Sequence, residues 1–355
     1  MTINTTSSLN RNFGLDLIRV VAISLVLIAH AGITSVYGLK IGGLGVEIFF
    51  VLSGFLIGQI LIRDFSGGVN SRVIMNFWVR RWFRTLPLYY AVIILKFIFL
   101  DSSLGPKVLV YFVFLQNNFV GIDFLPVSWS LVIEEWFYLT IPILMFLFLR
   151  KNITKEKFLF FLIAFILLEN IIRLLWVIYS GRGYAGIVGN FPFRLDSLMI
   201  GVLLAHLKLN YNSIYKRLNS GLLFLLFFGA FFLLLFVFAS VSKQGALKDE
   251  LIWTRTIWFS LVSVLIALQI PFIANIKVSG KAWLGKLITL LSLYTYSIYL
   301  IHPFVFHAII ESKEITFLWF FQALLAVLLT IIFSAIIYKF YEKPMMDLRD
   351  KIKFY

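Results

Sequence analysis

The sequence predicts an all-α, polytopic membrane protein: a bundle of about ten transmembrane helices with both termini in the cytoplasm. The first reason is composition, because 61% of the 355 residues are hydrophobic and only 14% are charged, whereas a soluble domain is about half apolar and a quarter charged. The second reason is that the apolar runs are too many and too long to be core helices. These runs take up most of the chain, so no large soluble domain is expected.

Ten apolar segments are predicted to form the membrane helices. They lie near residues 13–36, 43–62, 85–100, 128–149, 158–179, 193–207, 219–241, 252–275, 287–310 and 317–340. The sixth of them is short. The segment 106–121 is apolar but too short to cross a bilayer, so we expect a re-entrant or interfacial piece there.

The distribution of basic residues orients the predicted bundle. With the N-terminus inside, the inner loops and tails hold 21 of the 32 Lys and Arg residues, and the outer loops hold six. Cytoplasmic loops carry such an excess, so we expect an even number of spans in the cytoplasmic (inner) membrane. The net charge of +15 then indicates membrane topology and attraction to anionic membrane lipids, and no nucleic-acid partner.

The chain contains no cysteine, which excludes disulfides, thiolate zinc sites and a cysteine nucleophile.

The first apolar run of the chain is longer than the core of a signal peptide and contains Arg19 and His30, so a cleavable signal peptide is not expected. Residues 1–344 are predicted to form one membrane-embedded domain, and residues 345–355 a short cytoplasmic tail.

Ionisable side chains recur within the predicted helices, where each must pair with another group or line a wet cavity. They are Asp16, Arg19, His30, Glu47, Glu134, Glu135, Glu169, Arg173, Arg194, Asp196, Arg255 and His302. Glu169 and Arg173 are four residues apart, which favours a structural ion pair on one helix face. Asp16 and Arg19 are three residues apart, so a simple pair and a functional role are both open.

Arg19 and His30 share the first predicted helix. They are eleven residues apart, about three helical turns, so both lie on nearly the same face and are separated by roughly 16 Å along the axis. A histidine in lipid needs a polar partner, and it titrates near neutral pH, which suits a general base. From the residues alone, a structural and a catalytic role for His30 both remain open.

Glu134 and Glu135 lie less than two turns into the fourth predicted helix. Adjacent residues point about 100° apart on a helix, so we expect one carboxylate to line a site and the other to pack elsewhere. Their depth matches that of His30, and a base oriented by a carboxylate is a common catalytic arrangement. A contact between His30 and Glu134 is therefore a hypothesis.

Arg80, Arg81 and Arg84 lie at the predicted cytoplasmic mouth of the third helix. Arg81 and Arg84 share a helix face, and their guanidinium forks are suited to phosphate groups. The alternative is that they only reflect the positive charge of inner loops. Arg194 and Asp196 begin the short sixth helix near the outer face, and both a structural and a substrate-facing role are open.

Several motifs of soluble enzymes do not occur: the chain has no Walker A loop, GxSxG elbow, HExxH or GxGxxG sequence. Gly42, Gly43 and Gly45 open the second predicted helix, which indicates close helix packing or an irregular start.

Seven segments, in order along nearly the whole chain, resemble the acyltransferase 3 family of integral-membrane O-acyltransferases. They are LDLIR at 15–19 with His30 eleven residues after Arg19, GVEIFFVLSGFL at 45–56, RWFRTLPLYY at 81–90, WSLVIEEWFY at 129–138, FRLDSL at 193–198, SIYLIHP at 297–303 and YEKP at 341–344. Each segment is unspecific alone, and the order and spacing carry the resemblance.

The resemblance implies transfer of an acyl group, usually acetyl, from cytoplasmic acyl-CoA to a hydroxyl of an envelope glycan or lipid-linked sugar. Acetyl-CoA is the expected co-substrate, no metal is expected, and envelope-sugar assembly proteins are expected partners. Some relatives carry an SGNH hydrolase-like domain, which this sequence is predicted to lack because it ends about ten residues after its YEKP segment.

The resemblance also implies roles for particular residues. His30 is expected to act as general base or acyl carrier, Glu134 to orient it, and Arg19 to line the donor path or polarise the carbonyl. Arg81, Arg84 and Arg80 are expected near the phosphates of the donor. Residues expected to bind substrate or support the site are Asp16, Ser53, Glu135, Arg194, Asp196 and His302.

Two other functions fit the residues. A flippase or secondary transporter of a glycan or lipid-linked precursor also has many spans and buried charges, although no convincing internal repeat is visible. An accessory protein that scaffolds an envelope-sugar complex would tolerate replacement of Arg19, His30 and Glu134.

Overall fold

The computed structural model describes residues 11–33, 35–36, 39–65, 68, 70–149, 154–181, 183–243, 247–277, 282–310, 317–349 and 351. Within these ranges the long helices are α1 (Phe13–His30), α2 (Ile41–Phe65), α3 (Ser71–Phe99), α6 (Ser128–Leu149), α7 (Lys155–Ser180), α9 (Leu195–Asn210), α11 (Gly221–Lys243), α14 (Trp258–Ile273), α15 (Ala282–Ile309) and α16 (Phe317–Ile337).

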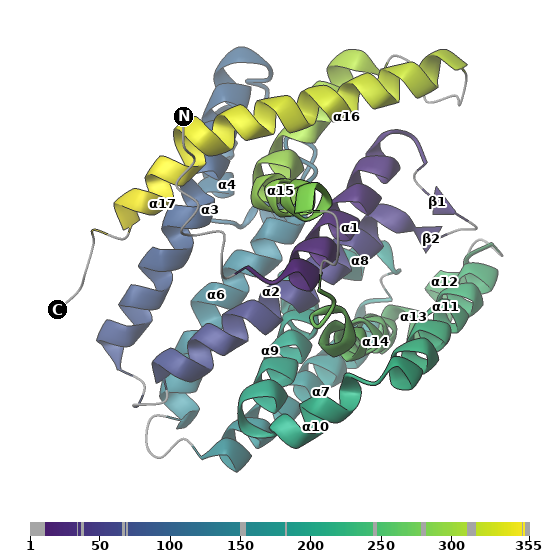
Figure 1. The fold of residues 1–355 in the computed structure, drawn as a ribbon. Coiled ribbons are helices and arrows are strands. Elements are labelled where there is room, and N and C mark those ends of the chain that lie inside the picture. Colours follow the sequence, from purple (N-terminus) through teal and green to yellow (C-terminus); the bar gives the residue numbers. More distant parts are fainter. Residues whose placement is uncertain are drawn as a thin grey trace.

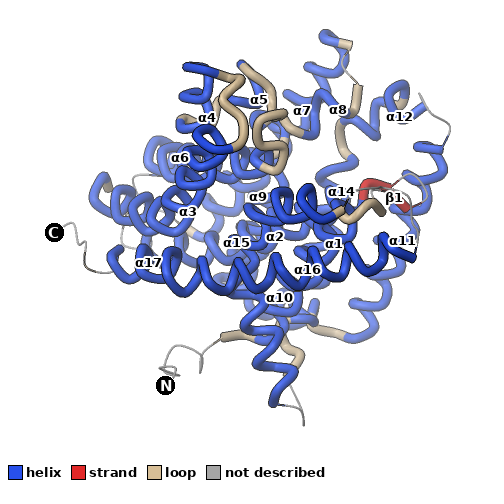
Figure 2. The backbone as a smooth tube through the Cα atoms, turned by 90° about the horizontal axis from the view of Figure 1, so that it is seen from above, coloured by secondary structure: helices blue, strands red, loops and turns tan. Residues whose placement is uncertain are grey.

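Short elements connect the long helices. They are the antiparallel pair β1 (Ser35–Val36) and β2 (Leu39–Lys40), the helices α4 (Leu109–Phe112), α5 (Gln116–Phe119), α8 (Ala185–Val188), α10 (Asn212–Leu218), α12 (Leu247–Glu250), α13 (Ile252–Arg255) and α17 (Lys343–Arg349), the 3-10 turns Gly105–Val108 and Phe191–Phe193, and the π-helical turn Tyr338–Glu342. Figure 2 shows α4, α5 and α8 along one edge of the molecule, beside the loops that join them.

The predicted all-α membrane fold is confirmed, and each of the ten predicted helices overlaps one long helix. Eight helices among the described residues are long and apolar enough to cross a membrane. The helices α9 and α14 have 16 residues each, so a count of ten spans is not confirmed. The orientation stays a prediction. Six of the basic residues that support it lie outside the described residues: Arg150, Lys151, Arg182, Lys281, Lys313 and Lys353.

Three predicted helix boundaries were wrong, and the structure shows a physical reason for each. The first helix ends at His30, because Gly32 adopts a positive φ of 126° that a helix does not allow. The third begins at Ser71, fourteen residues early, because the Asn70 side chain caps it by accepting a hydrogen bond from the Val73 amide at 3.0 Å. The eighth is broken into α13 and α14, where Arg173 Nη1 donates to the Thr256 carbonyl at 2.5 Å.

The segment 106–121 forms short helical turns and no long helix, as predicted. Its Tyr111 hydroxyl donates to the Gly121 carbonyl at 2.8 Å, which closes the segment on itself. Carbonyls of this piece also accept hydrogen bonds from Tyr89 and Tyr90 of α3 and from Trp136 of α6, so its backbone is paired with protein groups, as a non-helical segment near a membrane requires.

The α1–α2 pair lies between two groups of helices (Figure 1). On one side α15, α16, α3 and α6 gather, and on the other side α7, α9, α11 and α14. Helix α2 contributes to the apolar cores of both groups, with Phe50 and Ile57 in one and Val51 and Phe55 in the other. It is apolar all round because it is covered on both sides.

Close packing of α2 against α9 depends on glycine. A Cβ atom on Gly54 would lie 1.9 Å from the Leu198 carbonyl oxygen, and one on Gly201 would lie 2.2 Å from the Val51 carbonyl oxygen. Small residues allow such backbone contact between membrane helices. Gly45 packs similarly against Ala22 of α1, as the close-packing hypothesis for the start of this helix predicts.

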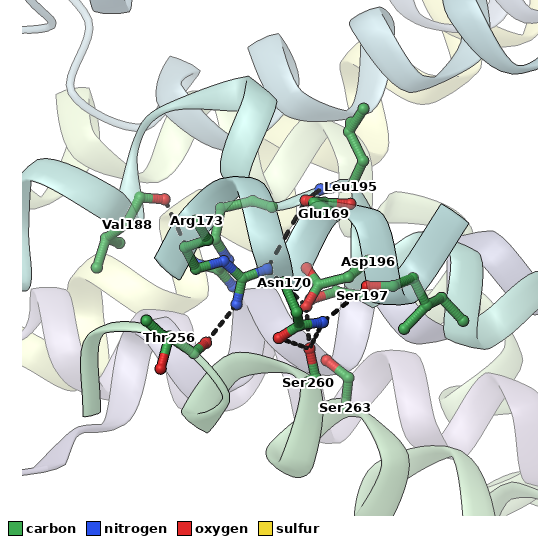
Figure 3. Close-up of polar contacts among 12 residues, drawn as sticks. Glu169, Asn170, Arg173, Val188, Leu195, Asp196, Ser197, Thr256, Ser260 and Ser263 are labelled. Carbon is green, nitrogen blue, oxygen red and sulfur yellow. Dashed lines mark hydrogen bonds and ion pairs between the residues drawn. The ribbon is translucent and has the colours of Figure 1, made fainter. Parts of the chain in front are cut away.

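Buried charges connect α7, α9 and α14 (Figure 3). The Arg173 guanidinium lies 2.7 Å from an oxygen of Asp196 and 3.7 Å from one of Glu169, and all three side chains are buried. Glu169 also accepts from the Leu195 amide at 2.6 Å, which satisfies an orphan donor at the start of α9. The predicted structural pair of Glu169 and Arg173 is therefore part of a larger network.

Candidate functional site

A cavity of about 440 Å³ lies among α1, α2, α3, α6 and α15. We call it the arginine cavity, because four arginines line it: Arg19, Arg63, Arg81 and Arg84. Its polar lining also includes Ser53, Gln59, Thr85, Ser130, Glu134, Tyr138, Thr295, Tyr296 and Tyr299. Among the described lining residues Glu134 is the one carboxylate, so the cavity carries an excess of positive charge.

Arg81 and Arg84 both line this cavity, as their shared helix face predicts. In the described structure the Nε of Arg81 is buried without a hydrogen-bond acceptor, and a buried donor of this kind is suited to an anionic ligand atom. Arg63 approaches the same cavity from the last turn of α2. The sequence does not predict this place for Arg63, because Arg63 follows the predicted end of the second helix and falls in a basic inner loop.

Arg80 is placed differently from its neighbours. Its side chain is 62% exposed, lies 3.9 Å from the Asp64 carboxylate and is not part of the cavity lining. The reason is helical geometry, because a residue adjacent to Arg81 points about 100° away from it. The structure therefore separates Arg80 from Arg81 and Arg84, although all three were predicted to lie near the phosphates of the donor.

Arg19 is held in the cavity wall by Asp16. The Asp16 carboxylate accepts hydrogen bonds from Arg19 at 2.9 Å, from Arg11 at 2.6 Å and from the Ser292 hydroxyl at 2.7 Å. Asp16 is buried and does not line the cavity. The two alternatives for this pair were a simple ion pair and a functional role. The geometry is compatible with both, since Asp16 orients Arg19 and Arg19 faces the cavity.

Glu134 and Glu135 point to different places, as their adjacency predicts. Glu134 lines the cavity, where it accepts hydrogen bonds from the Ser53 hydroxyl at 2.6 Å and from the Tyr138 hydroxyl. Glu135 is buried between helices and accepts from the Thr85 hydroxyl at 2.6 Å. Ser53 therefore supports Glu134, and Glu135 packs away from the cavity.

His30 contacts His302 and not Glu134 in the described structure. The two imidazole rings meet edge to face with their centroids 4.6 Å apart. The Nδ1 of His30 lies 2.9 Å from the Val26 carbonyl, and that of His302 lies 3.0 Å from the Ile298 carbonyl. A carbonyl can only accept, so a neutral ring donates from Nδ1 and keeps its lone pair on Nε2.

Tyr299 links the cavity to this histidine pair. Its ring lines the arginine cavity and lies 6.0 Å from the ring of His302. Its hydroxyl bonds Ser130, another lining residue, at 2.6 Å. The cavity thus extends from the arginines to Tyr299, whose side chain lies between the cavity and the histidine pair.

Arg194 and Asp196 do not line the arginine cavity. Asp196 belongs to the buried network of Arg173 and also accepts from the Ser260 hydroxyl. Arg194 pairs with Glu47 and lines a separate pocket. For Asp196 the structure shows contacts of the structural kind only. The sequence left both roles open, because spacing along the chain does not show which helices face Asp196.

The family model described as an acyltransferase domain, of the acyltransferase 3 family, matches residues 12–339. The chain belongs to this family. The comparisons give no support to the transporter alternative. No solved structure matches the chain significantly.

Curated relatives have names that agree with the family. A Staphylococcus aureus (strain COL) protein named "Putative O-acetyltransferase SACOL0978" is 28% identical over 93% of this chain and 56% of its own length. "Putative peptidoglycan O-acetyltransferase YrhL" of Bacillus subtilis (strain 168) is 28% identical over 93% of this chain and 54% of its own. Peptidoglycan O-acetyltransferase OatA of Listeria monocytogenes is 31% identical over 38% of this chain and 24% of its own.

The chain spans about half the length of the first two relatives. In the part of the chain that the structure describes, no group of three or more His, Asp or Glu side chains is placed to hold a metal ion. The polar lining of the arginine cavity is suited to an organic anion, because guanidinium groups and hydroxyls make up most of it.

Proposed function

We propose that this protein is a membrane O-acetyltransferase that takes its acyl group from acyl-CoA. One observation carries the proposal: four arginines line a single cavity, which extends to Tyr299 beside the His30–His302 pair. Acyl-CoA combines a polyanionic end with a thioester on a long arm, so a basic cavity that leads to a base fits both parts of the donor.

The phosphates of the donor bind at Arg63, Arg81 and Arg84. Guanidinium groups form paired, charge-assisted hydrogen bonds to phosphate oxygens. Arg19 lines the path of the arm. It does not polarise the reacting carbonyl, because eleven helical residues place it roughly 16 Å from His30 along α1.

His30 is the proposed general base. Its Nδ1–H is directed at the Val26 carbonyl, which leaves Nε2 to take the proton of the acceptor hydroxyl while that oxygen attacks the thioester carbon. The C–S bond then breaks, and the thiolate of CoA takes up the proton from His30. A transient acyl-histidine would use the same Nε2 lone pair, so both versions of the mechanism need this tautomer.

Glu134 serves the donor cavity and not the base. Its position beside Ser53 and Tyr138, in a wall shared with Arg81 and Arg84, supports a role in fixing the hydroxyls and balancing the arginines. This role replaces the earlier hypothesis in which Glu134 orients His30.

The proposed acceptor is a hydroxyl of a cell-envelope glycan, reached from the outer face of the cytoplasmic membrane. The names of the relatives from Bacillus subtilis and Listeria monocytogenes support this class, because both refer to peptidoglycan. Proteins that assemble envelope sugars are the expected partners, since they hold the acceptor.

The test compares O-acetyl esters on envelope glycans in cells that make the wild-type protein, no protein, or His30→Ala at equal membrane levels. Loss of one ester in both the null and the variant supports the proposal. The purified protein is then assayed for acyl-CoA consumption. A wild-type protein that neither changes any envelope ester nor consumes acyl-CoA contradicts the proposal, and full activity of His30→Ala contradicts the role of His30.

A further inference from the structure

A second pocket, of about 260 Å³, lies beside the arginine cavity. We call it the aromatic pocket and define it by Trp129, Tyr184, Trp258, Glu47 and Arg194. Its other lining residues include Lys40 and Gly43, at the junction of β2 and α2. Neither the proposed donor site nor the proposed base uses these residues.

The aromatic side chains of this pocket pack against neighbouring rings. Trp129 meets Phe50 edge to face at 6.1 Å, and Tyr184 stacks on Phe259 at 5.3 Å. Trp129 and Tyr184 are both partly exposed. Rigid rings with exposed faces provide flat apolar surfaces for a ligand at little conformational cost.

One charged donor in the pocket lacks an acceptor. The Arg194 side chain is 2% exposed, its Nη2 donates to Glu47, and its Nη1 donates to the Val188 carbonyl at 3.3 Å. In the described structure its Nε has no hydrogen-bond partner, and neither does the hydroxyl of Ser242, which lines the same pocket. Buried donors without partners are costly, so an oxygen atom of a ligand is the group that would satisfy them.

The position of the pocket relates it to the proposed chemistry. Phe50, which contacts Trp129, lines the arginine cavity on its other side. Gly42, next to Gly43, packs against Ala29, the neighbour of His30, since a Cβ atom on Gly42 would lie 2.9 Å from that of Ala29. The aromatic pocket therefore adjoins both the donor cavity and the end of α1 that carries His30.

We infer that the aromatic pocket binds one pyranose ring of the acceptor glycan. A pyranose has apolar C–H faces that match aromatic rings, and an edge of oxygen atoms that match the free donors of Arg194 and Ser242. The volume is just below the roughly 300 Å³ of the smallest ordinary ligand pockets, so it suits one ring of a glycan whose remainder lies outside. The assignment of this sugar as acceptor rests on the proposed function.

The test measures sugar binding without acyl-CoA, by saturation-transfer NMR on the full chain in lipid nanodiscs. The probes are β-1,4-linked N-acetylglucosamine disaccharide and maltose. Gly43→Leu adds an apolar side chain to the pocket lining, at a position where a Cβ atom meets no heavy atom within 4 Å. Gly229→Leu is the matched control, since Gly229 is equally unobstructed and lies on α11, outside the pocket.

A second pair of variants removes a ring. Tyr184→Ala takes away one wall of the pocket, and Tyr179→Ala removes a tyrosine that is 85% exposed and not part of the lining. The inference predicts saturable binding of at least one probe, weakened at least tenfold in Gly43→Leu and Tyr184→Ala and retained in both controls.

Two results would overturn the inference: no saturable binding of either sugar to the wild-type protein, or binding that Gly43→Leu leaves unchanged. Acyl-CoA consumption, measured afterwards with acyl-CoA added to the same wild-type preparation, separates this test from that of the proposed function. Consumption without sugar binding refutes the pocket assignment alone. Sugar binding without consumption and without any change in envelope esters refutes only the proposed acyltransferase activity.

Discussion

At the scale of single residues, the surroundings of His30 show how the proposed base is oriented without a carboxylate. Its Nδ1 lies 2.9 Å from the carbonyl of Val26, one helical turn earlier, so the helix backbone sets the tautomer. The sequence predicted a polar partner for His30, and the hypothesis was that this partner is Glu134. The partners are a carbonyl and His302, which only the packing of α1 against α15 brings together.

Replacement of the cavity arginines is predicted to weaken donor binding. Arg81→Gln and Arg84→Gln should each raise the KM for acyl-CoA roughly 10- to 150-fold, because each loses a charge-assisted contact of roughly 1.5–3 kcal/mol. Arg80→Gln is the control, since its side chain lies outside the cavity. Steady-state kinetics of purified variants measure the effect, and an equal rise in KM for Arg80→Gln would contradict the placement of the donor.

At the scale of elements, the contact between α2 and α9 positions the cavity wall. Gly54 follows Ser53, whose hydroxyl holds Glu134 in the cavity. The backbone of α9 approaches so closely that no side chain fits at Gly54. The sequence indicated close packing for glycines at the start of this helix, but it did not identify Gly54 or its partner helix.

Gly54→Ala is predicted to destabilise the protein, because the added methyl group meets the Leu198 carbonyl. Overpacking of this kind costs typically about 1–3 kcal/mol, which outweighs the gain of roughly 1 kcal/mol in helix propensity. Thermal unfolding in detergent should show a lower Tm for Gly54→Ala. Gly229→Ala, on the open face of α11, should be neutral or slightly stabilising. A Gly54→Ala protein with an unchanged Tm would show that α2 and α9 can move apart without cost.

The network of Arg173 joins three helices through one guanidinium group. Arg173→Met is predicted to lower stability strongly, because Glu169 and Asp196 would remain buried without a cation, a loss of about 3–5 kcal/mol. Arg217→Met, at an exposed position of α10, is the control. Tm and the yield of folded protein report the difference, and an unchanged Tm for Arg173→Met would mean that this network is not structural.

At the scale of the whole molecule, the orientation of the bundle is a prediction that rests on the distribution of charge. The positive-inside rule predicts that α10 faces the cytoplasm and that the turn containing Lys107 faces outward. The chain has no cysteine, so single cysteines can be introduced without background. Lys107→Cys should react with an impermeant maleimide in intact cells, and Arg217→Cys only after permeabilisation. The reverse labelling pattern would invert the proposed direction of acyl transfer.

The membrane fold, the long helices, the divergence of Glu134 and Glu135, and the family can be predicted from the linear chain. These properties depend on composition, helical periodicity and local motifs, which are all present in the sequence. Which charged groups meet depends on the tertiary structure. It separates Arg80 from the arginine cavity, adds Arg63 to it, pairs Arg194 with Glu47, and places His30 beside His302. These contacts join residues far apart in the chain, and they depend on how the helices pack, which spacing within one helix does not encode.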